Sequence, residues 1–137
     1  MSTTETIIKT VLAHYPAAQA IYLFGSFGTG DERADSDADI ALLLPPAEAK
    51  KAGSLVMSPL AGGLEELLQR KIDLINLRQV PTVLQKEVVA SERRIYEGDR
   101  FAAEEFEMLV LSFYQKLNEE RGGIIAAALA DRRFHKI

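Results

Sequence analysis

Apolar residues recur along this chain with two different spacings, and the change from one to the other predicts its elements. Near the start, five of them follow the i, i+3, i+4 spacing of an amphipathic helix: Ile7, Ile8, Val11, Leu12 and Tyr15. Ser2 or Thr3 can cap this helix, and Pro16 ends it. Short apolar runs predict buried strands instead, at 20–24, 39–44 and 71–77.

Glycine and proline interrupt the pattern between the second and third of these strands. The interruptions are Pro45, Pro46, Gly53, Pro59, Gly62 and Gly63. We therefore expect residues 45–63 to form a loop with little regular structure, followed by a short helix over 63–71. A helix should then run from Pro81 to about Glu92, and a short strand from 93 to 97.

The longest apolar stripe follows the last predicted strand. It occupies one side of a helix over 100–120, which Gly122 and Gly123 are expected to end: Phe106, Leu109, Val110, Phe113 and Leu117. We expect the stripe to be chiefly core. Met108 and Leu111 lie off it and, with the apolar run at 124–129, exceed what a small domain needs, which favours a partner surface.

The order of helices and strands predicts an α/β or α+β domain. At 137 residues the chain has room for a single core. We expect residues 1–98 to form that core, and residues 99–137 a helical segment that packs on it and contacts a partner.

Composition narrows the class of protein. The net charge of -4 argues against a protein that follows a nucleic-acid polymer, and the absence of cysteine excludes disulfides and thiolate metal sites. No apolar stretch approaches the length needed to cross a membrane, and the first residues do not resemble a leader peptide, so we expect a cytoplasmic protein.

A glycine-rich loop that leads into an acidic strand, residues 24–44, is the candidate site. Three common readings of it fail on spacing. A P-loop would need lysine at Asp31, a dinucleotide fingerprint would need glycine at Arg33, and an EF-hand would need glycine at Ile40 and glutamate at Pro46. What remains is Gly25-Ser26, ten residues, then an Asp-x-Asp pair.

The spacing of the carboxylates favours hard cations. Asp37 and Asp39 lie two residues apart, so a strand aims both the same way, and Asp73 lies within an apolar strand where it needs a partner. If the two strands are neighbours, the three carboxylates converge. Gly25 permits close backbone approach, and Ser26 can hold a phosphate oxygen. We therefore expect two-metal chemistry at a nucleoside triphosphate, with Mg²⁺ ions roughly 3.5–4 Å apart.

These residues resemble the signature of the polymerase-β-like nucleotidyltransferase superfamily, over residues 20–77 of the chain. The short length resembles its minimal branch, the minimal nucleotidyltransferase (MNT) antitoxins encoded beside HEPN-domain RNase toxins in type VII-like pairs. The resemblance implies a small mixed sheet flanked by helices, with a C-terminal helical tail.

The resemblance also implies roles. Asp37, Asp39 and Asp73 would bind two Mg²⁺ ions, and Asp73 would help to activate the acceptor hydroxyl. Gly25 and Ser26 would grip the triphosphate of ATP. Members of this group transfer AMP from ATP to a tyrosine near the active site of the HEPN toxin and so neutralise it. The expected partner is a cognate HEPN toxin in a hetero-oligomer, with neither a nucleic-acid polymer nor a membrane.

Two other functions stay open. Many relatives carry arginine in a G-S-x-A-R-G loop where this chain has Thr29, which favours an antitoxin that masks its toxin by binding alone. Transfer to the hydroxyl of a small molecule is the other alternative. Larger members carry extra domains that hold the acceptor, whereas this chain has only the core and the helical segment, so a partner protein must bring its own binding surface.

Overall fold

The computed structural model describes the backbone of residues 2–25 and 37–135, and side chains within these ranges up to Glu120. The elements follow one another as α1 (Thr3–His14), β1 (Ala20–Phe24), β2 (Ala38–Leu43), α2 (Pro46–Ala52), α3 (Pro59–Leu68), β3 (Ile72–Asn76), the short 3-10 helix η1 (Leu77–Gln79), α4 (Thr82–Ala90), β4 (Arg94–Glu97) and α5 (Arg100–His135). This order confirms the predicted α/β class. Among the described helices, none is both long and apolar enough to cross a membrane.

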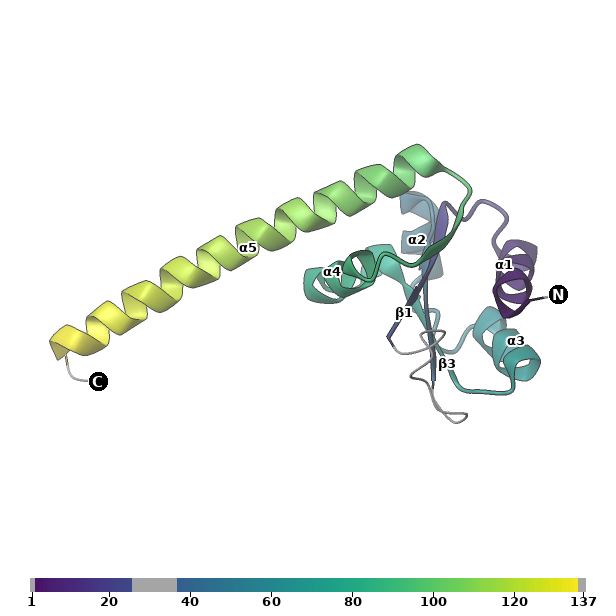
Figure 1. Ribbon diagram of the computed structural model, residues 1–137, viewed down its shortest axis with the longest axis horizontal. Coiled ribbons are helices and arrows are strands. Elements are labelled where there is room, and N and C mark those ends of the chain that lie inside the picture. The colour runs from purple at the N-terminus through teal and green to yellow at the C-terminus, as the bar shows by residue number, and fades with distance from the viewer. Residues whose placement is uncertain (1, 26–36, 136–137) are drawn as a thin grey trace.

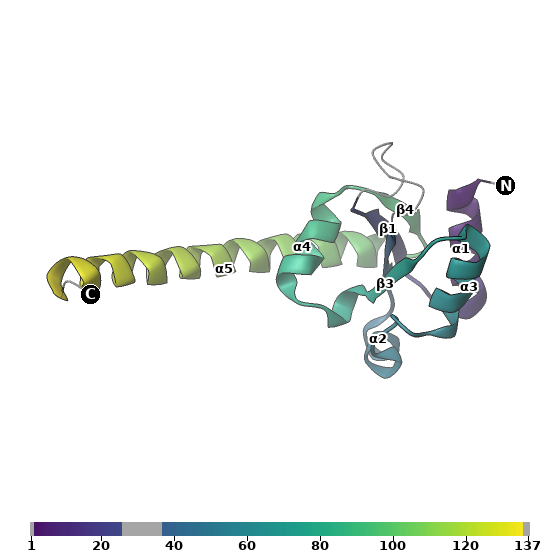
Figure 2. The same ribbon diagram turned by 90° about the horizontal axis from the view of Figure 1, so that it is seen from below.

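A mixed sheet forms the middle layer, as expected. Its strands lie in the order β3-β2-β1-β4, with β2 and β3 parallel and β1 antiparallel to both β2 and β4. Helices α1, α2 and α3 contribute buried residues to one core cluster, and α4 and α5 to the other, so helices cover both faces of the sheet (Figures 1 and 2).

Alternation along the strands decides which side chain joins which layer. On β2, Ile40 and Leu42 belong to the cluster with α1, α2 and α3, whereas Ala41 and Leu43 belong to the cluster with α4 and α5. Asp39 is two residues from Ala41, so it belongs to the α4/α5 face. Asp73, two residues from the buried Ile75, belongs to the same face.

The prediction of an irregular loop over 45–63 was wrong, because two of its prolines begin helices. Pro46 and Pro59 are the first residues of α2 and α3. Proline suits this position, since its fixed φ is already helical and the N–H that it lacks would have no partner within the helix. The Ser58 hydroxyl accepts from the Ala61 amide at 3.2 Å and so caps α3.

The prediction that Gly122 and Gly123 end the last helix was also wrong. Helix α5 continues through both to His135. A glycine inside a helix costs only about 1 kcal/mol relative to alanine, and the alanine-rich residues that follow are good helix formers. The helix begins against the sheet and extends well past α4 (Figure 1).

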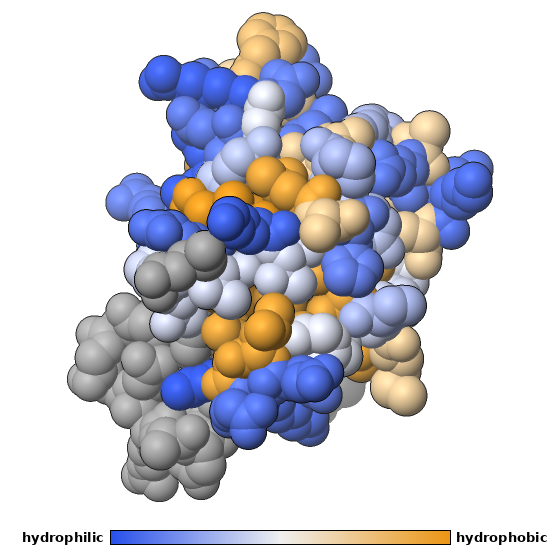
Figure 3. Space-filling view, turned by 90° about the vertical axis from the view of Figure 1, so that its right-hand side faces the viewer, coloured by the Kyte–Doolittle hydropathy of each residue, from blue (hydrophilic) through white to orange (hydrophobic). Residues whose placement is uncertain are grey.

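The stripe on α5 is only partly core. Phe106 and Val110 are buried against the sheet, but Leu109 is 46% exposed and Phe113 is 61% exposed. The expectation of a stripe that is chiefly core therefore holds for its N-terminal part and fails beyond it. On the side of the molecule formed by α1 and α3, apolar residues reach the surface in separate patches among polar ones, as is ordinary for a small domain (Figure 3).

Candidate active site

Two of the predicted carboxylates lie side by side. In the parallel pair of β2 and β3, Asp39 is the register partner of Asp73, so their backbones are about 4.8 Å apart, the usual spacing of neighbouring strands. Asp37 is exposed and directly precedes β2. The expectation that the strands are neighbours is therefore confirmed, and both aspartates arise at the start of a strand on one face of the sheet.

The like charges affect one another. Partial burial raises the pKa of Asp39 above its ordinary value, and the nearby carboxylates of Asp73 and Asp37 raise it further. A divalent cation would offset this repulsion, and carboxylate oxygens are the ligands that Mg²⁺ prefers. The donor set thus fits the expected ion. Among the described side chains, no three carboxylate, histidine or cysteine groups lie close enough together to hold one metal ion, so the predicted convergence of all three aspartates is not seen in this structure. Mutual repulsion of their charges opposes such convergence.

Gly25 packs directly against this pair. It follows β1, and its φ of +70° is a conformation that glycine adopts without strain. A Cβ atom at this position would lie 2.1 Å from Oδ2 of Asp39, much closer than any real contact. Only glycine therefore lets the loop backbone approach the carboxylate. The other predicted loop residue, Ser26, lies outside the described residues, as do Thr29 and Arg33.

Arg93 is a residue of this site that the sequence reasoning missed. Its Nη1 atom donates a hydrogen bond to the Gly25 carbonyl at 3.1 Å. The Leu23 amide donates to the Arg93 carbonyl at 3.0 Å, and this contact between distant segments brings the arginine to the loop. In sequence, Arg93 is the first of two adjacent arginines at the start of the strand predicted over 93–97, and local pattern gives no signal for its place beside the loop.

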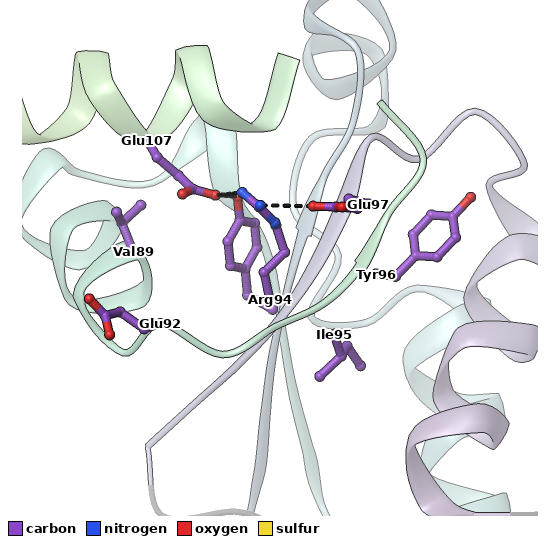
Figure 4. A pocket seen from close by; sticks show the side chains of 8 residues that line it. Val89, Glu92, Arg94, Ile95, Tyr96, Glu97 and Glu107 are labelled. Carbon is purple, nitrogen blue, oxygen red and sulfur yellow. Dashed lines mark hydrogen bonds and ion pairs between the residues drawn. The ribbon is translucent and has the colours of Figure 1, made fainter. Parts of the chain in front are cut away.

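A pocket of about 580 Å³ opens elsewhere, between β4, α4 and α5 (Figure 4). The carboxylates at 37, 39 and 73 do not line it. Four of its polar side chains form one network: Arg94 forms ion pairs with Glu107 and, at 2.8 Å, with Glu97, and the Tyr22 hydroxyl donates to Glu107 at 2.6 Å. We therefore regard this network as an anchor that ties α5 to the sheet.

The environment of Tyr22 agrees with an anchor. The residue is only 2% exposed. Burial raises the pKa of its hydroxyl well above the ordinary value, and the adjacent Glu107 carboxylate raises it further. Tyr22 therefore stays neutral and acts as a hydrogen-bond donor.

Comparisons with known proteins agree with this geometry. The chain is 35% identical over 125 residues to the protein adenylyltransferase MntA of Shewanella oneidensis, a match that covers 91% of this chain and 86% of the relative. A crystal structure of a toxin-antitoxin pair with AMP-PNP contains a chain that is 32% identical, with a TM-score of 0.69, covering 92% of this chain and 98% of the other.

A second solved structure holds a tri-AMPylated Shewanella oneidensis HEPN toxin in complex with its MNT antitoxin. It matches with a TM-score of 0.64 and 31% identity, over 93% of this chain and 96% of the matching chain. These relatives confirm the resemblance to MNT antitoxins. Residues 6–101 match the family described as polymerase beta, nucleotidyltransferase. This match spans more than half of the chain and includes Gly25, Asp39 and Asp73, so the chain belongs to the polymerase beta nucleotidyltransferase family and is a nucleotidyltransferase.

Proposed function

We propose that this protein is an antitoxin that transfers AMP from ATP to a tyrosine of a cognate HEPN RNase toxin and thereby neutralises it. One observation carries the proposal: Asp39 and Asp73 are register partners, and Gly25 lies so close to the Asp39 carboxylate that a side chain there would clash with it, in a chain 35% identical to a protein adenylyltransferase. Both proteins would act in the cytoplasm, without a nucleic-acid polymer or a membrane.

Each residue of the site has a proposed part in the reaction. The loop at Gly25 and Ser26 holds the triphosphate, and Asp37, Asp39 and Asp73 hold two Mg²⁺ ions. When bound, Mg²⁺ neutralises the negative charge of the phosphates and of the transition state. The tyrosine oxygen attacks the α-phosphorus, the bond to the bridging oxygen of the β-phosphate breaks, and pyrophosphate leaves. The phenolic proton passes to the carboxylate of Asp73.

The acceptor is a protein in this proposal because the solved relatives hold a protein beside the antitoxin. The described chain consists of the sheet, the helices on its faces and α5. The solved relatives contain a toxin together with the antitoxin, and one of those toxins carries AMP. A toxin that brings its own binding surface needs no further domain on the enzyme.

The proposal can be tested with the purified protein, the toxin encoded beside it and ATP labelled at the α-phosphate. We expect Mg²⁺-dependent label on the toxin, located by mass spectrometry on a tyrosine, and loss of the label with Asp39→Asn or Asp73→Asn. Chelation of Mg²⁺ should abolish AMP transfer without dissociating the complex of this protein with the toxin. Equal labelling by the wild type and both variants, or no labelling by any of them, would refute enzymatic transfer.

A second function, masking of the toxin by binding alone, has support of its own. The loop has Thr29 where many relatives have arginine, and α5 exposes large apolar side chains that suit a partner. A growth assay with the toxin distinguishes the two functions. Rescue by the double variant Asp37→Asn and Asp39→Asn would favour masking, whereas loss of rescue with an intact complex would favour catalysis.

A further inference from the structure

Helix α5 is held firmly at its base. Ala103, Phe106 and Val110 are buried in the α4/α5 core cluster, and the Arg78 guanidinium lies over the Phe106 ring at 5.4 Å from its centroid. The pairing of Glu107 with Arg94 adds a polar tie to the edge strand β4 (Figure 4). The apolar packing and the ion pair together fix the direction in which α5 leaves the core.

Beyond this base, one flank of α5 presents apolar side chains that the core does not cover. Leu109, Phe113 and Leu117 recur at i, i+4 and i+8, so they form one continuous row along the helix. Leu109 and Phe113 are exposed, and Leu117 is half-buried. The row continues the buried stripe of Phe106 and Val110 past the end of the core.

Phe113 and Leu117 of this row line one side of a groove, and Thr82, the first residue of α4, lines the other. A hollow of about 280 Å³ lies between the helices, lined by Thr82, Phe113, Lys116, Leu117 and Glu120. We call this the α4–α5 groove. Its apolar wall is bordered by one basic and one acidic side chain, Lys116 and Glu120, as suits an amphipathic helix with an apolar face and charged flanks.

The remaining exposed apolar residues of α5 do not share the groove. Phe101, Met108 and Leu111 lie more than about 100° around the helix from Phe113, at the 100° advance of each helical residue. Among the described elements, α4 is the one that makes extensive contact with α5, so these three residues have no second wall beside them.

The groove belongs to the same face of the sheet as the candidate site. Helices α4 and α5 cover the face that carries Asp39 and Asp73, and the groove lies between those two helices. A protein bound in the groove is thus held on the side to which the carboxylates belong. A protein acceptor must reach the carboxylates, so this placement favours an acceptor protein as the occupant of the groove.

From these observations we propose that the α4–α5 groove binds an apolar helix of the acceptor protein and holds that protein while a distant part of it enters the active site. The inference rests on the proposed function for the identity of the partner, a HEPN toxin. Binding energy gained away from the reacting atoms raises the affinity for the acceptor. Groove substitutions should therefore weaken toxin binding and leave the chemical step intact.

The test compares Phe113→Asp in the groove with Met108→Asp outside it. Both side chains are highly exposed, at 61% and 64%, and both lie on α5, so neither change should unfold the protein. We expect Phe113→Asp to weaken toxin affinity about tenfold or more, as loss of an interface anchor does, and Met108→Asp to change it by less than about threefold. Transfer at saturating toxin and ATP binding by the free protein should stay at wild-type levels for both.

A second measurement uses the absence of cysteine from the chain. A single cysteine introduced by Phe113→Cys or by Met108→Cys can carry an environment-sensitive fluorophore. Addition of the toxin should shift the emission to the blue at position 113, and little or not at all at 108.

Three results would overturn the inference. The first is toxin affinity unchanged by Phe113→Asp, and the second is equal loss with both variants. The third is a wild-type dimer that Phe113→Asp dissociates while toxin binding is unchanged, which would assign the groove to a second copy. Failure of the proposed function looks different: the wild type would bind the toxin without labelling it, and the binding comparison would still test the groove.

Discussion

Gly25→Ala is the substitution for which the structure makes the sharpest prediction. The new methyl carbon would lie 2.1 Å from Oδ2 and 3.1 Å from the carboxyl carbon of Asp39. An ordinary carbon contact needs well over 3 Å, so the carboxylate must move by about 1 Å or rotate away. Asp39 would then lose its place beside Asp73.

The expected losses differ in size. A non-glycine residue at a φ of +70° costs about 1–2 kcal/mol in stability, which lowers Tm by roughly 3–8 °C in a domain of this length. Activity should fall much further, because a catalytic group misplaced by about 1 Å costs on the order of a hundredfold in rate. AMP transfer should therefore drop at least about a hundredfold while the protein stays folded.

Gly53→Ala is the matched control. Gly53 also has a positive φ, of +62°, but a Cβ atom there would meet no atom within 4 Å. This variant should lose a similar amount of stability from backbone strain alone and keep wild-type transfer. Thermal unfolding, Mg²⁺-dependent ATP binding and AMP transfer would be measured for both.

The double variant Gly25→Ala with Asp39→Ala separates contact from backbone strain. Removal of the carboxylate removes the clash, so the stability loss of the double variant should be smaller than the sum of the two single losses. Wild-type transfer by Gly25→Ala would refute the reasoning. A loss of transfer by Gly53→Ala as large as that of Gly25→Ala would refute it equally, because it would attribute the effect to general instability.

Three further variants test the electrostatics. Asp39→Asn should raise Tm at neutral pH in chelator, because burial and the charge of Asp73 raise the pKa of Asp39 and so disfavour its charged form in the folded protein. The wild type should gain stability as pH falls through that raised pKa, and Mg²⁺ should stabilise the wild type more than the variant. A variant with no higher Tm than the wild type in chelator would contradict this prediction. The wild type should lose stability as pH rises above about 10, because Tyr22 then loses its proton in the unfolded chain and keeps it in the folded one, and Tyr22→Phe should remove this loss. Denaturant unfolding at pH 8 and at higher pH would measure it, and the same pH dependence of the unfolding free energy in both proteins would contradict it. Arg93→Ala should raise the KM for ATP several-fold with a smaller effect on kcat, because the Arg93 guanidinium lies beside Gly25 of the proposed triphosphate loop. Arg93→Lys should restore part of the affinity for ATP, and unchanged KM and kcat in Arg93→Ala would exclude a role of Arg93 in ATP binding.

Much of the fold follows from local pattern. The apolar spacing predicts α1, the strands β1, β2 and β3, and α4 to within about two residues, since each is a run with its own period and a clear end. The failures were at glycine and proline. Pro46 and Pro59 interrupt the pattern and also begin helices, and Gly122 lies in a helix that its neighbours sustain. Proline and glycine are compatible both with loops and with certain helix positions, and the residues that follow decide which of the two forms.

The sequence predicts only those residues of the candidate site that stand out by their spacing or by their apolar surroundings. Asp37, Asp39 and Asp73 are visible because two lie in one Asp-x-Asp pair and the third is a charge inside an apolar strand. The register that makes Asp39 and Asp73 neighbours depends on the pairing of β2 with β3, which spacing suggests but does not fix. Arg93 was missed because its place beside Gly25 comes from a contact between segments distant in sequence.

The division of the α5 stripe links the fold to the proposed recognition. Phe106 and Phe113 belong to one sequence pattern, yet the first is 7% exposed and the second is 61% exposed, because the core ends between them. A stripe that serves only folding would stop where the core stops, since each exposed Leu or Phe leaves about 1.5–3 kcal/mol of burial unused. Its continuation through Phe113 and Leu117 is therefore best explained by a second surface that covers it. One helix would then hold the domain together at its base and bind the acceptor protein further along.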